Sequence, residues 1–238
     1  MFDRFTQKTG LGQFTQKGTE LRHARLEETR LLNDLAVEQK EVALINTAID
    51  KSQAYDQIAV TEFLGTKKCN SVNHFKTFQI AMESLKKAMD DVNNVDHQWT
   101  KAERQEVGEM RRLVKEMASS GVSDADRTSI EGDEKILLEF YIKGNKAVKK
   151  ALSAFNDVHK FHETVDSALL KRHYNSPGNV NLVVDLTGDP KLMSALGKID
   201  TLMPVIRSSL AEAVKAEEDA VAMTISLAKR IKDKWLVK

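Results

Sequence analysis

The feature that most constrains the fold is an uninterrupted helical pattern over residues 19–64. Two interleaved series of mostly apolar residues each recur at seven-residue steps: Leu21, Leu35, Val42, Ile49 and Phe63 in one, and Ala24, Leu31, Ile45 and Ala59 in the other. Such a seam of alternating three- and four-residue steps is typical of a helix that packs lengthwise against other helices. A straight helix of this length would be roughly 70 Å long. The pattern therefore predicts long helical partners and an elongated molecule.

The seam is interrupted by polar residues. Four of its positions hold Glu28, Glu38, Ser52 and Asp56. Polar residues at so many core positions disfavour an isolated two-stranded coiled coil. They predict a bundle in which some core layers are polar.

Three further stretches have seams of the same kind, over residues 72–117, 124–174 and 190–236. Val148 lies in the middle of the second of them. Helix starts are expected at Ser71 or Asn73, at Ser123 or Asp124, and at Asp189 before Pro190, because these residue types cap helices. Pro204 predicts a kink. The expected fold is all-α: an elongated bundle of long, kinked antiparallel helices over residues 19–238, preceded by a leader over residues 1–18.

Composition limits the classes of function. The chain has 238 residues, with 36 Lys and Arg against 35 Asp and Glu, so it lacks the basic excess of a typical nucleic-acid-binding protein. Cys69 is the only cysteine, which excludes an intrachain disulfide. No apolar run approaches the length of a membrane span, and the first residues lack the apolar stretch of a signal peptide. We therefore expect a cytoplasmic protein.

No motif indicates an enzyme. The sequence has no phosphate-binding loop, dinucleotide fingerprint or nucleophile elbow. His159, His162 and Glu163 lie within one helical turn and could hold a metal, but no second helix carries the matching Glu-x-x-His of a di-iron bundle. His162 lies on the seam, where we expect a hydrogen-bonded buried histidine, and Cys69 is expected to be an incidental thiol. The sequence predicts no cofactor and no catalytic residue.

The leader over residues 1–18 is short, basic and aromatic. Phe-Thr-Gln-Lys occurs twice in it, and Asp3 is its only acidic residue. Three glycines disfavour a stable helix in water, but the segment could become an amphipathic helix on an anionic bilayer. The alternative is a terminus whose phenylalanines pack on the bundle. The membrane interpretation assigns contacts to Phe2, Arg4, Phe5, Lys8, Leu11, Phe14 and Lys17.

A second candidate for membrane contact is a stripe of lysines. Lys143, Lys146 and Lys150 lie on the predicted exposed face of the helix over residues 124–174. A solvated surface is the simpler interpretation. The functional one is attachment to an anionic bilayer, worth about 1 kcal/mol per residue.

The loop over residues 175–189 contains the least helical sequence. Its segment LVVDLT, at 182–187, resembles a SUMO-interaction motif, in which an apolar strand adds to the edge of a partner's sheet. That interpretation assigns partner contacts to Val183, Val184 and Leu186. The alternative is a loop that packs these side chains on the bundle.

The whole chain resembles a BAR domain of the type with an N-terminal amphipathic helix. The resemblance rests on the basic leader, on the run ARLEETRLLNDL at 24–35 that opens the first long helix, and on the long seamed helices with bend sites. It implies a crescent-shaped antiparallel homodimer that binds and bends membranes, with lysines on the concave face and the leader inserted into the bilayer. A BAR monomer has three principal helices, whereas four segments are expected here, so either one break is a kink or the chain is a different long bundle.

These observations lead to two functional hypotheses. The first is a peripheral membrane-remodelling protein that acts as a curved dimer on anionic membranes. The second is a structural or interaction scaffold without lipid activity. A pore-forming toxin is disfavoured, because the sequence lacks a long apolar hairpin.

Overall fold

The computed structural model describes residues 11–94, 124–175, 178 and 181–231. The described helices are α2 (Leu11–Asp56), the π-helix η1 (Gln57–Leu64), a helix over residues 72–94, α4 (Asp124–Tyr174) and α5 (Pro190–Ile231). Two short strands, β1 (Lys68–Cys69) and β2 (Val184–Asp185), pair antiparallel, with Lys68 opposite Asp185 and Cys69 opposite Val184. The predicted all-α class is confirmed. The predicted length and bending of the bundle stay predictions.

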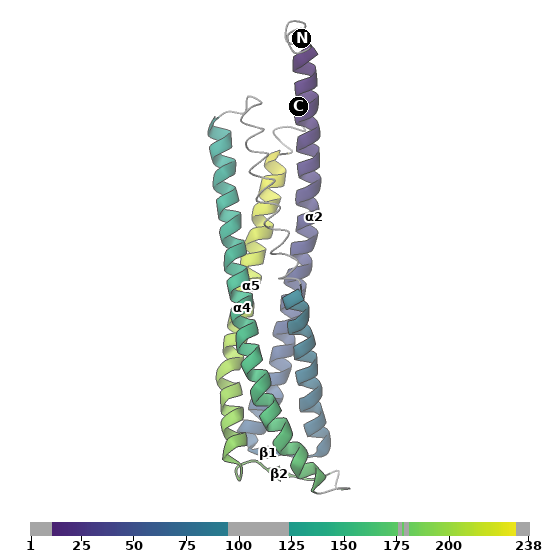
Figure 1. Cartoon of the computed structure of the whole chain (residues 1–238), viewed down its shortest axis with the longest axis vertical. Helices are drawn as coiled ribbons and strands as arrows, with labels where there is room; N and C mark the ends of the chain where they lie inside the picture. Colours follow the sequence, from purple (N-terminus) through teal and green to yellow (C-terminus); the bar gives the residue numbers. More distant parts are fainter. Residues whose placement is uncertain (1–10, 95–123, 176–177, 179–180, 232–238) are drawn as a thin grey trace. The chain divides into compact units, whose positions relative to one another are not determined.

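The chain divides into two compact units. Unit 1 comprises residues Met1–Lys40, Trp99–Ile142 and Ala216–Lys238, and unit 2 comprises Glu41–Gln98 and Lys143–Lys215. The helices of unit 2 surround one apolar core, and Figure 1 shows β1 and β2 together at one end of these helices.

The seam residues of three helices lie in the core of unit 2. On the helix over residues 72–94, Phe75, Phe78, Met82, Leu85, Met89 and Val92 are all buried. The seam positions of α4 from Val148 to Leu169 and those of α5 from Leu192 to Ala213 are buried as well. The predicted continuation of the second helix to residue 117 lies outside the described residues. Side-chain spacing alone therefore identified the core-facing side of these three helices in unit 2.

Two of the four polar seam positions, Glu38 and Ser52, are buried as the sequence predicts, whereas Asp56 is half-buried. Ser52 is buried in unit 2, where its hydroxyl donates a hydrogen bond to the Ile49 carbonyl at 2.7 Å. Glu38 is buried in unit 1, where it accepts hydrogen bonds from Tyr141 and Thr224. The expected polar core layers are therefore present.

Two of the predicted caps begin helices of unit 2. The Ser71 hydroxyl accepts the His74 amide at 3.1 Å, and the Asp189 carboxylate accepts the Leu192 amide at 3.1 Å. Each bond satisfies one amide that has no partner within the helix. Asp189 also pairs with Arg172 near the end of α4, which ties the loop between α4 and α5 to the helix before it.

The first helix differs from the prediction at both ends. It begins at Leu11 rather than near Thr19, so it includes the second half of the leader. At its other end the chain continues as a π-helix over Gln57–Leu64 instead of an α-helix to Gly65. Ala59 and Phe63 are nevertheless buried as the seam predicts. The heptad pattern therefore identified the core face of this segment but not its helix type.

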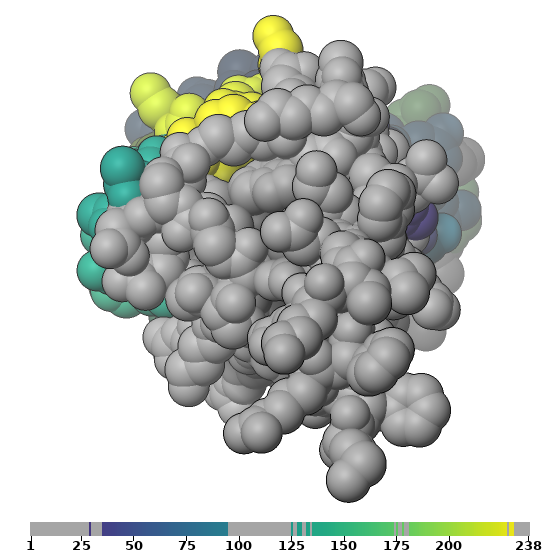
Figure 2. All heavy atoms as spheres, turned by 90° about the horizontal axis from the view of Figure 1, so that it is seen from above, coloured from purple at the N-terminus to yellow at the C-terminus, as the bar shows by residue number. Residues whose placement is uncertain are grey.

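In unit 1, α4 and α5 lie next to each other, as the teal and yellow atoms of Figure 2 show. Arg230 of α5 forms an ion pair with Asp133 of α4 and donates a hydrogen bond to the Ser129 hydroxyl at 3.4 Å. These polar contacts join the two helices at their surface.

Candidate functional site

The lysine stripe of α4 lies on an exposed surface of unit 2. Lys143, Lys146 and Lys150 are exposed, as predicted, while Ala147, Val148 and Ala151 on the opposite side of the helix are buried. The helix is amphipathic here because its apolar residues follow the helical repeat. The predicted exposure of the three lysines is therefore correct.

The sequence interpretation missed a fourth lysine of this surface. Lys149 is exposed as well, and residues 140–156 contain four lysines and no acidic residue. None of the four has an ion-pair partner among the residues that the structure describes. The absence of any acid over this stretch was the signal available in the sequence. We call Lys143, Lys146, Lys149 and Lys150 the lysine surface.

The leader contributes little to the described structure. Phe2, Arg4, Phe5 and Lys8 lie outside the described residues. Leu11, Phe14 and Lys17 belong to α2, and only the backbone of these three residues is described. Their assignment to membrane contact stays a prediction.

The segment that resembles a SUMO-interaction motif lies beside β1. Val183 is exposed, Val184 pairs with Cys69, and Leu186 is fully buried. The amide of Leu186 donates a hydrogen bond to the Lys67 carbonyl at 3.0 Å. Leu186 is therefore not accessible to an extended partner, because its side chain is packed in the core. This arrangement favours the alternative interpretation, in which the loop packs these side chains on the bundle.

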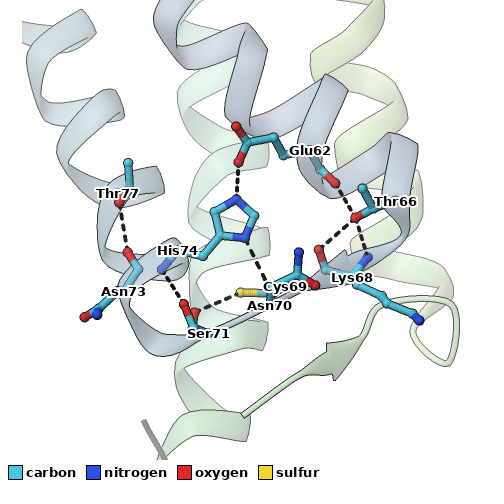
Figure 3. A network of polar contacts seen from close by, with 9 residues as sticks. All are labelled: Glu62, Thr66, Lys68, Cys69, Asn70, Ser71, Asn73, His74 and Thr77. Atoms are coloured by element: carbon cyan, nitrogen blue, oxygen red, sulfur yellow. Dashed lines mark hydrogen bonds and ion pairs between the residues drawn. The ribbon is translucent and has the colours of Figure 1, made fainter. Parts of the chain in front are cut away.

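A network of polar contacts links η1, the turn that follows it and the start of the helix over residues 72–94 (Figure 3). The Asn70 amide donates to Nδ1 of His74 at 3.4 Å, and Nε2 of the same ring pairs with the Glu62 carboxylate. Thr66 bonds to the backbone of both Glu62 and Lys68. Lys67 has a φ of 57°, the left-handed conformation that reverses the chain here. The network holds a tight turn in place.

Cys69 lies in this turn but points into the core rather than into a polar environment. Its side chain is buried, and burial raises the pKa of the thiol, an effect that a backbone hydrogen bond of Ser71 partly offsets. A raised pKa reduces the thiolate fraction and with it the reactivity of the sulfur. The turn therefore offers no activated nucleophile at Cys69.

His162 is buried, as its seam position predicts. Its Nδ1 lies 3.1 Å from the hydroxyl of Tyr55, and its ring lies 4.4 Å from the ring of Phe78. Burial, and secondarily the neighbouring His159, lowers the pKa of His162 to about 4. The residue is therefore a neutral hydrogen-bonding group near pH 7.

Two negative findings limit the chemistry of the described residues. Within these residues, no three His, Cys, Asp or Glu side chains are placed to hold a metal ion, and this search included His159, His162 and Glu163. Nor does any helix in this part of the chain have a segment both apolar and long enough to cross a bilayer.

Two features of unit 2 thus stand out: the exposed lysine surface and the buried ring of His162. Comparison with known proteins adds no assignment to either: no protein-family model, curated protein or solved structure matches the chain.

Proposed function

We propose that this protein attaches reversibly to anionic membrane surfaces through the lysine surface of α4 and the basic, aromatic leader. The observation that carries the proposal is the group of four exposed lysines over residues 140–156, where no acid balances them. The chain as a whole is nearly neutral, so this concentration of charge is local.

The binding free energy that the lysine surface can supply on an anionic bilayer is too small for attachment without a second contribution from the leader. Each lysine near an anionic bilayer contributes about 1 kcal/mol, so four give about 4 kcal/mol. That corresponds to a dissociation constant near 1 mM, which is too weak for attachment by one copy alone. Insertion of phenylalanines, each worth up to about 1.5–3 kcal/mol before the cost of ordering the leader, would supply the difference.

We further propose a BAR-like homodimer as the form that acts on membranes. The all-α structure, the long seamed helices and the leader support this assignment. Two copies would present two lysine surfaces and two leaders, which strengthens weak attachment through the raised effective concentration of the second contact.

Vesicle co-sedimentation tests the proposal. We expect the full chain to sediment with vesicles that contain phosphatidylserine and much less with pure phosphatidylcholine vesicles. Replacing Lys143, Lys146 and Lys150 by Glu should lower the partition coefficient by about a hundredfold, since at least 1 kcal/mol is lost at each position. The matched control replaces the exposed Lys191, Lys198 and Lys215 of α5 by Glu, with the same change in net charge.

The leader is tested separately by Phe5→Ser together with Phe14→Ser. This variant should bind less even at low salt, because it loses apolar insertion and no charge. Added salt should weaken the remaining binding by screening the lysines. If the parent fails to bind anionic vesicles, or if both lysine variants lose binding equally, the proposal fails and the scaffold hypothesis replaces it.

A further inference from the structure

A polar groove of unit 2, away from the lysine surface residues, offers a second site. The groove has a volume of about 510 Å³ and opens between the helix over residues 72–94 and α4. Its volume lies within the usual range of small-molecule sites. The charged and titratable residues that line it are Glu83, Lys86, His159, His162, Glu163 and Asp166.

His162 gives the groove a rigid polar wall. Only 7% of its surface is exposed, and Tyr55 holds its Nδ1 from the core side. The described residues provide no hydrogen-bond partner for Nε2, the remaining polar atom of the ring. Because His162 is neutral near pH 7, it can contact a cation in the groove without repelling it.

The other polar side chains make the groove negative. Three carboxylates, those of Glu83, Glu163 and Asp166, face a single ammonium group, that of Lys86. The carboxylate of Asp166 accepts a hydrogen bond from the Gln79 side chain at 2.9 Å, which fixes its position. Counting only these carboxylates and this ammonium group, the groove has an excess of two negative charges, so it disfavours phosphate and carboxylate ligands.

The spacing of these groups argues against a bare metal ion. The described His, Cys, Asp and Glu side chains form no group of three that could coordinate one. A ligand with two separated positive charges would neutralise the excess without requiring such close ligands. Met82 also lines the groove and offers an apolar wall for an aliphatic chain.

We propose that this groove binds a small organic dication of the diamine or polyamine class, with two ammonium groups joined by an aliphatic chain. The carboxylates of Glu83, Glu163 and Asp166 hold the ammonium groups, the side chain of Met82 contacts the methylenes, and the ring of His162 forms the polar wall. This site is independent of membrane attachment.

The test is a titration of the full chain with cadaverine at 0.15 M NaCl, followed by calorimetry and by the NMR signals of the histidine rings. We expect saturable binding that shifts the His162 signals. Glu83→Gln together with Glu163→Gln should weaken binding roughly threefold to thirtyfold, the range for two exposed ion pairs. Both positions are exposed, so the variant should fold normally. The matched control is Asp200→Asn with Glu212→Gln on α5, which removes the same charge elsewhere and should leave the affinity unchanged.

Two further probes distinguish the source of the cation. Pentylamine has one ammonium group and should bind clearly more weakly than cadaverine. Lysyl-lysine represents the side chains of a partner protein and should also bind more weakly than cadaverine. The proposal is overturned if binding does not saturate, if the His162 signals do not move, if the control variant loses the same affinity, or if either further probe binds as tightly as cadaverine.

Discussion

Two buried tyrosines, one in each unit, bring a hydroxyl group to a polar residue on a helix seam. In unit 2, the Tyr55 hydroxyl lies 3.1 Å from Nδ1 of His162, whose ring contacts Phe78. In unit 1, the Tyr141 hydroxyl donates to the Glu38 carboxyl at 2.7 Å, and Thr224 adds a second contact at 3.4 Å. In unit 2 the polar residue, His162, is thus packed against an aromatic ring. In unit 1 the polar residue, Glu38, instead accepts hydrogen bonds from hydroxyls on two helices.

The difference shows two ways of keeping a polar group inside a helical bundle. A histidine can be kept neutral by burial, so that a single polar contact suffices on its core side. A carboxyl group has more acceptor capacity and is costly to bury without donors, and two helices supply them in unit 1. A charged seam residue without any polar partner should not be tolerated.

Val148→Asp introduces such a residue into unit 2 and should have the largest effect. Val148 is buried in the apolar core, and its replacement would bury a charge without a partner. We expect a loss of more than about 4 kcal/mol in the free energy of unfolding, measured with urea by circular dichroism. Ser153→Asp on the exposed face of α4 is the control and should change this value by less than about 0.5 kcal/mol. Equal stability of the Val148→Asp variant and the parent would show that this face of α4 is not packed.

The His162 arrangement predicts a pH dependence of stability. The folded pKa of about 4 lies below the usual value of 6.5, so the unfolded chain binds a proton at higher pH than the folded chain. The contribution of His162 to the free energy of unfolding is therefore fully present above pH 6.5. It is lost as the pH falls toward 4, by up to about 3 kcal/mol.

Urea unfolding at pH 7 and pH 4.5 measures this effect as the difference between parent and variant. His162→Gln keeps a polar side chain but does not titrate, so its stability should fall less on acidification. His159→Gln, at a partly exposed position one turn earlier, should retain most of the parent's pH dependence. A His162→Gln variant with the full acid sensitivity of the parent would assign that sensitivity to other groups.

Removal of the tyrosine hydroxyls compares the two units directly. Tyr141→Phe removes the shorter bond, to a carboxyl group, and should cost about 1.5–3 kcal/mol. Tyr55→Phe removes a contact to a neutral ring and should cost about 1 kcal/mol. Thermal and urea unfolding measure both, and a larger cost for Tyr55→Phe would reverse our comparison.

Much of the fold follows from spacing in the sequence. Apolar residues at helical intervals identified the core faces, and capping residue types identified the helix starts at Ser71 and Asp189. The π-helix over Gln57–Leu64 was not predicted, because the apolar pattern does not reveal how the backbone hydrogen bonds shift. Nor was the burial of Cys69, which depends on the pairing of β1 with β2.

Polar sites were predicted only in part, because their partners come from distant segments. The seam predicted that Glu38 and His162 would be buried, but not that Tyr141 and Tyr55 would contact them. Glu217 and Thr224 continue the series of Leu196, Met203 and Leu210, so their burial could have been found by extending that seam through polar residues. The groove beside His162 requires two helices to be placed together, which the pattern within one helix does not specify.

The smallest expected effect concerns the second donor to Glu38. Thr224 is buried, and its hydroxyl lies 3.4 Å from the Glu38 carboxyl oxygen, near the upper limit for a hydrogen bond. Thr224→Val replaces this hydroxyl by a methyl group of similar size, so the packing of α5 is kept and only the polar contact is lost. We expect a cost of about 0.5 kcal/mol in the free energy of unfolding, at the low end for a hydrogen bond, and clearly less than that of Tyr141→Phe.

Thr224→Ser is the complementary control, because it keeps the hydroxyl and loses one methyl group, worth about 0.8 kcal/mol. The double variant with Tyr141→Phe then measures the coupling: if both hydroxyls stabilise the same carboxyl group, the loss of the two together should differ from the sum of the single losses. Strict additivity would mean that the two donors act independently and that unit 1 has no shared polar layer at Glu38.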